Sequence, residues 1–247
     1  MTDIERVADW LRQAERAVVF TGAGMSTESG IPDFRSPGGV WAKNDPVYFD
    51  DFVRSQDARN EYWRQKSEAH REFHIARPNP AHQAVARWEQ IGRIRGVITQ
   101  NIDGLHQEAG SKHVLELHGT ARFVSCLQCE ARFAADEWVT VYLERRIAPD
   151  CPECRGPLKH ATISFGQALP TDVLMEAQRW ADRSDLFIVM GSSLVVYPAA
   201  GLPVTAKRAG SRLVILNRDE TPLDHAADAV LRGGLGETVS AIEALLI

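Results

Sequence analysis

The sequence predicts an α/β fold in which a doubly wound parallel sheet forms a large domain and a smaller domain is inserted into it. Two observations carry this prediction. Short apolar segments alternate with amphipathic segments along most of the chain, as strands and helices do in a parallel sheet. Two stretches, residues 36–77 and 121–160, interrupt the alternation, and the second of them holds all four cysteines.

Apolar runs predict the strands of the large sheet at Ala17–Thr21, Gly96–Thr99, Val114–Leu117, Leu186–Met190, Leu213–Leu216 and Ala229–Leu231. Amphipathic patterns predict helices at Asp3–Gln13, Ala81–Ile91, Asp172–Asp182, Ala199–Ala209 and Glu237–Leu246. Asn79 followed by Pro80 is typical of a helix start, because asparagine caps the first turn and proline fits its first position. Ligands of such a sheet bind at the carboxyl ends of its strands.

Composition excludes several classes of protein. The chain has 247 residues, 44% of them hydrophobic, which is enough for the core of one large domain with an insertion. Its formal net charge of −5 argues against a nucleic-acid partner and against an anionic membrane surface. The chain lacks any run of 18 apolar residues, and its polar N-terminus lacks a signal peptide's apolar stretch, so we expect a cytoplasmic protein.

A glycine-rich turn, Gly22–Gly24, directly follows the first predicted strand. Glycines at this point let the backbone approach a pyrophosphate closely and aim amide N–H groups at its charge. The spacing differs from the usual G-x-G-x-x-G, so the turn alone is a weak nucleotide signal. The segment Gly30–Arg35 adds a carboxylate, an aromatic ring and a guanidinium (Asp33, Phe34 and Arg35), which a turn that only held phosphate would not need.

The four cysteines form two C-x-x-C pairs, Cys126 with Cys129 and Cys151 with Cys154, separated by 21 residues. This is the spacing of a tetrahedral zinc site, into which unrelated buried thiols rarely fall. Four thiolates fill the tetrahedral shell and leave no position for water, so we expect the zinc ion to be structural. It would stabilise a segment that has too few apolar residues for a core of its own.

Polar side chains that suit catalysis follow two of the predicted strands. Gln100, Asn101 and Asp103 crowd the end of the strand Gly96–Thr99, where Asp103 can accept a hydrogen bond from an amide. The alternative interpretation is an Asn/Asp turn with local side-chain bonds only. His118 ends the next strand, and histidine is the usual general base near neutral pH.

Four other histidines are interpreted as structural: His70, His74, His113 and His225. His118 is favoured over His106 as the general base because it lies at the strand end itself. Gly191–Ser193 follows the strand Leu186–Met190 and offers hydroxyls and N–H groups that suit phosphate or ribose. Asn217 ends the next strand, where a ribose-binding group is expected.

Taken in order, the motifs at residues 22–35, 99–103, 117–119 and 191–193, with the paired C-x-x-C and Phe165-Gly166, resemble those of the sirtuins. The resemblance covers about residues 5 to 245. The segments 195–200 and 220–224 are most similar to the prokaryotic, undifferentiated branch of that family.

The resemblance implies an NAD-dependent protein lysine deacetylase or deacylase with a Rossmann-like domain that binds NAD, one structural zinc ion, and an acyl-lysine peptide or protein as substrate. It implies that the acyl oxygen attacks C1′ of the nicotinamide ribose and that His118 acts as general base toward a ribose hydroxyl. The implied products are nicotinamide, free lysine and O-acyl-ADP-ribose. Mono-ADP-ribosyl transfer or NAD hydrolysis at the same site is the alternative.

Carried over residue by residue, the resemblance implies His118 and Asn101 as catalytic residues. The implied cofactor-binding residues are Gly22, Ala23, Gly24, Thr27, Asp33, Phe34, Arg35, Gln100, Asn101, Ile102, Asp103, Gly191, Ser192, Ser193, Asn217 and Leu235. The implied substrate-binding residues are Ile163, Phe165, Gly166, Val195 and Val196, with the peptide added as a strand between Gly166 and Val195. The implied domains are 1–36, 76–121 and 160–247 (large), and 37–75 and 122–159 (small, helical and zinc parts).

The chain departs from the family's pattern at Ala161, Ser164 and Gln167, where relatives commonly carry Pro, an apolar residue and Glu. These positions flank the peptide groove, so they affect peptide preference and not the NAD chemistry. A Tyr-x-x-Arg pair that resembles a succinyl-lysine clamp is also incomplete, because Tyr62 is followed at the third position by Gln65. Neither the physiological targets nor the oligomeric state follows from the sequence.

Overall fold

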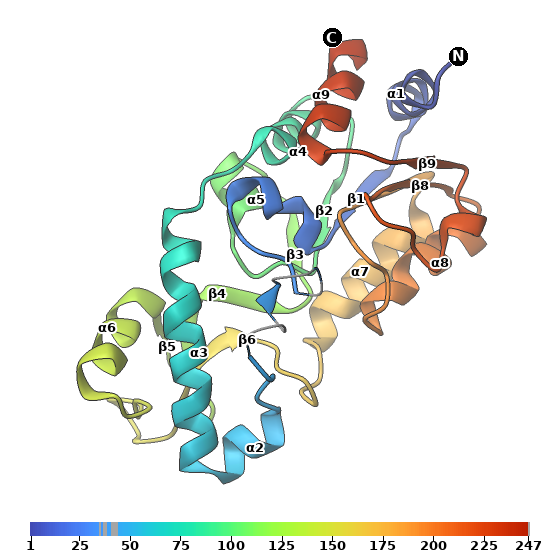
Figure 1. Cartoon of the computed structure of the whole chain (residues 1–247). Helices are drawn as coiled ribbons and strands as arrows, with labels where there is room; N and C mark the ends of the chain where they lie inside the picture. Colours follow the sequence, from blue (N-terminus) through green and yellow to red (C-terminus); the bar gives the residue numbers. More distant parts are fainter. Residues whose placement is uncertain (35, 37–38, 41–43, 247) are drawn as a thin grey trace.

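A parallel sheet organises the large part of the molecule (Figure 1). In the computed structural model, which describes residues 1–34, 36, 39–40 and 44–246, its strands pair in the order β3-β2-β1-β7-β8-β9. They are β1 (Ala17–Thr21), β2 (Gly96–Thr99), β3 (Val114–Glu116), β7 (Leu186–Met190), β8 (Arg212–Leu216) and β9 (Ala229–Leu231). The chain runs outward from β1 on one side and from β7 on the other, so the sheet is doubly wound and its switch point lies between β1 and β7.

Helices cover both faces of this sheet. On one face, α1 (Asp3–Gln13), α4 (Pro80–Gln90) and α9 (Leu235–Leu246) pack on inward-facing residues such as Val19 and Ile188. On the other face, α7 (Thr171–Arg183) and α8 (Leu202–Arg208) pack on residues such as Phe20 and Phe187. Every residue of β1 and β7 is buried, because both faces are covered, and this explains their continuous apolar runs.

The predicted helix start at Asn79 is confirmed. The Asn79 side chain accepts hydrogen bonds from the main-chain N–H groups of Ala81 and His82, and Pro80 occupies the first turn. The predicted helix Ala199–Ala209 is instead divided into a 3-10 turn at Ala199–Gly201 and α8, which has a proline in its own first turn.

The smaller part of the molecule has its own antiparallel sheet, in the order β5-β4-β6. Its elements are β4 (Gly119–Cys126), β5 (Arg132–Ala134), α6 (Ala135–Arg145) and β6 (Leu158–Thr162), to which α2 (Phe49–Arg54) and α3 (Gln56–Ile75) are added. A short helix, α5 (Leu105–Ala109), lies beside the large sheet. In Figure 1, α3 runs alongside α6 and the small sheet. The predicted fold class, a doubly wound sheet with an inserted smaller unit, is confirmed. The sequence analysis assigned residues 37–75 to a helical part but gave no bounds for α2 or α3.

An aromatic core holds α3 to the small sheet. Trp63 is fully buried and donates a hydrogen bond from Nε1 to the main-chain oxygen of Leu158 at 2.9 Å. Its ring stacks near that of Tyr142 on α6, with centroids 6.0 Å apart.

Among the helices that the structure describes, none is both long and apolar enough to cross a membrane.

Lys159 on β6 lies in this core almost without solvent contact. Its Nζ donates to the main-chain oxygens of His160, at 3.4 Å, and Thr162. Burial, and then the charge of Lys66, lower the pKa of Lys159 to about 7. Since the pKa in the unfolded chain is about 10.4, the folded protein binds fewer protons between these values, and stability therefore rises with pH through this window.

We expect Lys159→Met, which keeps the side-chain volume, to remove that pH dependence. Relative to the variant, the wild-type protein should gain about 2–3 kcal/mol of unfolding free energy between pH 7 and pH 9, from about 1.4 kcal/mol for each pKa unit crossed. Urea unfolding of both proteins at the two pH values measures the difference. Equal changes in the two proteins would show that Lys159 is charged and solvated in the folded state.

Candidate active site and metal centre

A cleft of about 880 Å³ opens at the carboxyl ends of the large sheet's strands and extends to β6. This volume is typical of a ligand site. The cleft brings together most of the residues that the sequence predicted: Gly22, Ala23, Gly24, Thr27, Asp33, Phe34, Gln100, Asn101, Ile102, His118, Ile163, Phe165, Gly166, Gly191, Ser192, Ser193, Val196, Asn217 and Leu235.

Three predicted residues stand apart from this set. Asp103 lines a smaller neighbouring pocket of about 90 Å³, which it shares with Asn101. Val195 is 46% exposed and does not line the cleft. Arg35 lies outside the described residues.

The glycines of the turn after β1 pack directly against the turn after β7. A Cβ atom on Gly22 would lie 2.8 Å from the main-chain oxygen of Gly191, and one on Gly24 would lie 2.9 Å from the Cα of Gly191. Gly24 also donates a main-chain hydrogen bond to that oxygen, at 2.9 Å. The sequence analysis explained these glycines by approach to a pyrophosphate alone; the structure adds a second reason, the close packing of two turns at the switch point.

Asn101 and Asp103 meet in a buried network around Ser26. The Asn101 Nδ2 donates to the main-chain oxygen of Gly22 at 3.0 Å and to Ser26 Oγ at 3.2 Å. Ser26 in turn donates to Asp103 Oδ2 at 2.7 Å, and the Leu105 N–H donates to Oδ1 at 2.9 Å. Burial raises the pKa of Asp103, against these hydrogen bonds. The network holds the Asn101 side chain in one orientation and goes beyond the local Asn/Asp turn considered from the sequence.

His118 lies in the short turn between β3 and β4, directly before the first residue of the small sheet. Its Nδ1 lies 3.0 Å from the main-chain oxygen of Gln100, and since a carbonyl only accepts, Nδ1 must carry the proton. In the neutral ring, Nε2 is then the acceptor. Burial lowers the pKa of His118 below its ordinary value, so the ring is neutral at pH 7 and suits a general base.

Gln100 also connects His118 to the turn after β7. Its Nε2 donates to Ser192 Oγ at 2.8 Å, while its own carbonyl accepts from His118. His106, by contrast, is buried on α5, where its Nε2 lies 3.0 Å from Thr21 Oγ1 at the end of β1. That position fits the structural interpretation of His106.

The four cysteine Sγ atoms gather within 4.8 Å of one another. The Cys126–Cys154 and Cys129–Cys151 sulfur pairs lie 3.4 and 3.7 Å apart, close to the edge of about 3.8 Å that a tetrahedron with Zn–S bonds of 2.3 Å requires. N–H groups of Gln128 and Gly156 point at two of the sulfurs, at 3.3 and 3.4 Å. A Cβ on Gly156 would lie 3.0 Å from Cys126 Sγ. The residues fit one structural zinc ion.

The loop after β6 forms one wall of the cleft. The Ser164 N–H donates to Gln167 Oε1 at 3.1 Å and the Gln167 N–H donates to the Ser164 oxygen at 3.0 Å. Two of the three residues that depart from the family's pattern, Ser164 and Gln167, therefore stabilise each other in one turn. The Phe165 ring packs near Tyr48, with centroids 5.9 Å apart.

Sequence reasoning missed several residues of the cleft. Ser26 organises Asp103, and its only signal was its place within the glycine-rich segment. Glu28 accepts from the Gly236 N–H at the start of α9. Lys66 reaches the cleft from α3, beside Tyr62, which the sequence analysis had considered only as part of an incomplete acyl-lysine clamp.

Comparison with known proteins gives one family. The model of the Sir2 family matches residues 22–198. The NAD-dependent protein deacetylase 1 of Bradyrhizobium diazoefficiens is 49% identical over 238 residues, which are 96% of this chain and 93% of that protein. The NAD-dependent protein deacetylase of Rhodopseudomonas palustris is 48% identical over 239 residues, 96% of this chain and 94% of that protein.

Solved structures agree with this assignment. A complex of Sir2 with a p53 peptide and NAD+ has a TM-score of 0.90 at 39% identity, and the match covers 99% of this chain and 98% of that one. The family match spans more than half of the chain, and the relatives are matched over almost their whole length. The doubly wound sheet, the cysteine cluster and the cleft between them are therefore those of a sirtuin, and the chain belongs to the Sir2 family.

Proposed function

We propose that this chain removes acyl groups from lysine side chains of proteins with NAD as co-substrate, giving nicotinamide, the free lysine and O-acyl-ADP-ribose. The observation that carries the proposal is the state of His118: neutral, at the cleft, with its Nδ1 proton committed to the Gln100 carbonyl. The chain's bacterial relatives bear the name of this activity.

The residues of the cleft fit NAD. Hydroxyl and main-chain groups of Ser192, Ser193 and Asn217 line one end and suit the adenosine half. Ile102 and Asp103 would hold the carboxamide, and Asn101, fixed by Ser26, would line the ribose. When bound, NAD supplies an activated ribose carbon with nicotinamide as its leaving group.

His118 Nε2 would take a proton from a ribose hydroxyl, because its lone pair is the one free acceptor on the ring. Phe34, with Ala23 and Thr27, would cover the reacting centre and exclude water. Ile163, Phe165 and Val196 line the part of the cleft next to β6 and would receive the acyl-lysine. The peptide backbone would add as a strand between Gly166 and Val195. Arg35 would lie with Phe34 on the loop that covers the pyrophosphate.

Two further assignments belong to this proposal. The large domain would comprise residues 1–36, 76–121 and 160–247, and the small domain residues 37–75 and 122–159, each built around one of the two sheets. The protein would act in the cytoplasm, where reduced cysteines remain available to zinc.

Mass spectrometry of a reaction with NAD and an acetyl-lysine peptide tests the proposal. We expect O-acetyl-ADP-ribose and deacetylated peptide in equal amounts, with nicotinamide released only when the peptide is present. Nicotinamide release without peptide would indicate NAD hydrolysis, and mass added to the protein would indicate ADP-ribosyl transfer. Either result in place of deacetylation would overturn the proposal.

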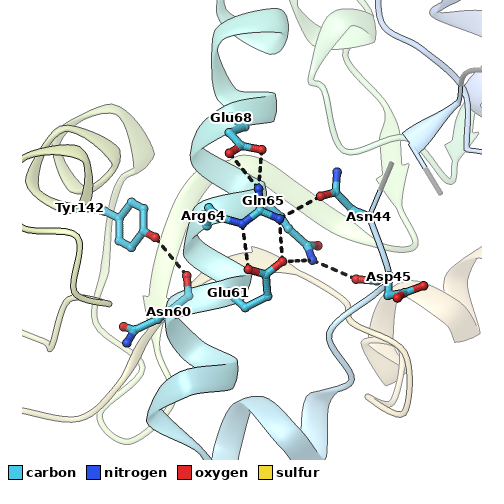
Figure 2. A network of polar contacts seen from close by, with 8 residues as sticks. All are labelled: Asn44, Asp45, Asn60, Glu61, Arg64, Gln65, Glu68 and Tyr142. Atoms are coloured by element: carbon cyan, nitrogen blue, oxygen red, sulfur yellow. Dashed lines mark hydrogen bonds and ion pairs between the residues drawn. The ribbon is translucent and has the colours of Figure 1, made fainter. Parts of the chain in front are cut away.

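We expect acetyl-lysine to be processed far better than succinyl-lysine, because Arg64, the arginine that precedes Gln65, is already committed to other partners. Figure 2 shows Arg64 held between Glu61 and Glu68, with nitrogen–oxygen distances of 2.6 and 2.8 Å. These contacts, chiefly from Arg64, lower the pKa of Glu61 to about 2. Gln65 itself donates to Glu61 and to the Asp45 carbonyl (Figure 2). A succinyl carboxylate therefore finds no bidentate arginine here.

Among the described residues, Lys66 and Arg218 are the lysine and arginine side chains that line the cleft. Arg218 is paired with Asp219 at 3.3 Å, and Lys66 Nζ lies 5.6 Å from the centre of the Tyr62 ring. Burying an unpaired carboxylate costs free energy, and an activation barrier raised by only ~3 kcal/mol lowers the rate ~100-fold. We therefore expect kcat/KM to be at least ~100-fold higher for the acetyl peptide than for a matched succinyl peptide. Equal values would contradict the prediction, and loss of succinyl turnover alone in Lys66→Met would then identify Lys66 as the partner.

A further inference from the structure

A second group of metal-ligating side chains lies outside the cleft, where α3 meets the start of α6. His70 and His74 are four residues apart on α3 and therefore share one face of that helix. Asp136, in the first turn of α6, faces them both. Its Oδ1 lies 3.0 Å from His70 Nε2 and 4.0 Å from His74 Nδ1, and the three ligand atoms lie within 4.8 Å of one another.

These separations are close to what a metal ion requires. Zinc–nitrogen bonds of about 2.0–2.1 Å and zinc–oxygen bonds of about 2.0–2.2 Å place tetrahedral ligand atoms about 3.4 Å apart. The two measured distances to Asp136 Oδ1 lie on either side of that value. His74 is 68% exposed in its side chain, so its ring can rotate the remaining distance without disturbing the core.

We propose that His70, His74 and Asp136 form a second site, separate from the four cysteines, that takes a divalent transition-metal ion of the zinc class. Two imidazoles and one carboxylate are a donor set that zinc, nickel and copper accept, whereas magnesium and calcium prefer oxygen ligands alone. Three protein ligands leave a position for water, so the ion exchanges with solvent, unlike an ion enclosed by four thiolates.

The site joins two elements of the small part of the molecule. An ion there would fix α3 to α6 and hold the ring of His70, which also lines the 90 Å³ pocket beside Asn101 and Asp103. Because the ion binds the folded arrangement and not the separated helices, the unfolding temperature rises as the ion concentration increases above the dissociation constant.

Titration of the protein with zinc chloride tests this site. The starting material carries its cysteine-bound zinc, verified as one ion per chain by metal analysis, and calorimetry follows further binding. We expect one additional equivalent in the wild-type protein. His74→Ala and Asp136→Asn should each weaken it by at least ~10-fold, since even the partners of ligands contribute 10–100-fold to metal affinity. Both variants should retain the first ion.

His113→Ala is the matched control. His113 also lies at the surface and contacts one carboxylate, with its Nδ1 2.7 Å from Glu89 Oε1. Among the described residues, neither cluster of metal-ligating side chains includes His113. Its removal should therefore leave binding of the second equivalent unchanged. The proposal is wrong if no second equivalent binds, or if His74→Ala and Asp136→Asn bind it as the wild type does. This readout is metal binding, so it stands or falls independently of deacylation.

Discussion

Replacing His118 with alanine is expected to lower kcat for deacetylation by roughly 10²–10⁴-fold, the range that a positioned general base contributes. The reason is geometric: Nδ1 is committed to the Gln100 carbonyl, which leaves Nε2 to accept the proton. The affinity for NAD should change little, because most of the cleft's lining belongs to other residues. Single-turnover rates and NAD titration by calorimetry measure the two effects separately.

The pH profile distinguishes a base from a merely structural histidine. In the wild type, kcat/KM should fall as the pH drops through the lowered pKa of His118, because a protonated ring cannot accept a proton. The variant should lose this acidic limb. His113→Ala, at an exposed ring outside the cleft, should keep both the rate and the limb. A His118→Ala variant that deacetylates at the wild-type rate would remove the residue from the mechanism.

Replacing Cys151 with serine is expected to release the zinc ion and unfold the small part of the molecule. Structural zinc contributes roughly 10–16 kcal/mol in small zinc-binding peptides, which exceeds the total stability of about 5–15 kcal/mol typical of a domain. Cys151 is also buried in the aromatic core with Trp63, so the loss spreads to α3. Activity should fall as a consequence, since Tyr62 on that helix lines the cleft.

Metal analysis and thermal unfolding measure this result together. Glu153→Ala is the matched control, because Glu153 is an exposed residue between two of the ligands and should retain one zinc per chain. If Cys151→Ser still carries one zinc ion and unfolds at the wild-type temperature, the four-cysteine site is not what stabilises the small sheet.

The large sheet could be predicted from the sequence almost residue by residue, because strands buried on both faces read as apolar runs ended by glycine or polar residues. Ala17–Thr21 and Leu186–Met190 are found as predicted. The bounds of helix α3 could not be predicted, because too few apolar residues recur along it at helical spacing. Tyr62 and Trp63 are buried, but much of the helix is charged. Helical spacing is visible only when one face alone is apolar.

The candidate site shows the same division. Polar residues at strand ends can be recognised from the sequence as candidate site residues, because the topology of a parallel sheet places all these ends at one edge. The contacts between them cannot be recognised in this way, since Ser26 and Asp103 are far apart in sequence and meet only after the fold forms. Tyr62 and Lys66 line the cleft from α3, while Lys159 meets the Tyr62 ring from β6 inside the core, and no local pattern connects the two elements.

The contact between the turns after β1 and β7 has a consequence for how this family can change. Gly22, Gly24 and Gly191 fill one another's Cβ positions, and Gly191 also has a φ of +62°, which other residues rarely adopt. A single substitution at any of the three meets main-chain atoms of the opposite turn, so no one-step mutational path leads away from this arrangement. The distance between the two turns of this chain is thus set by main-chain contact and not by any side chain.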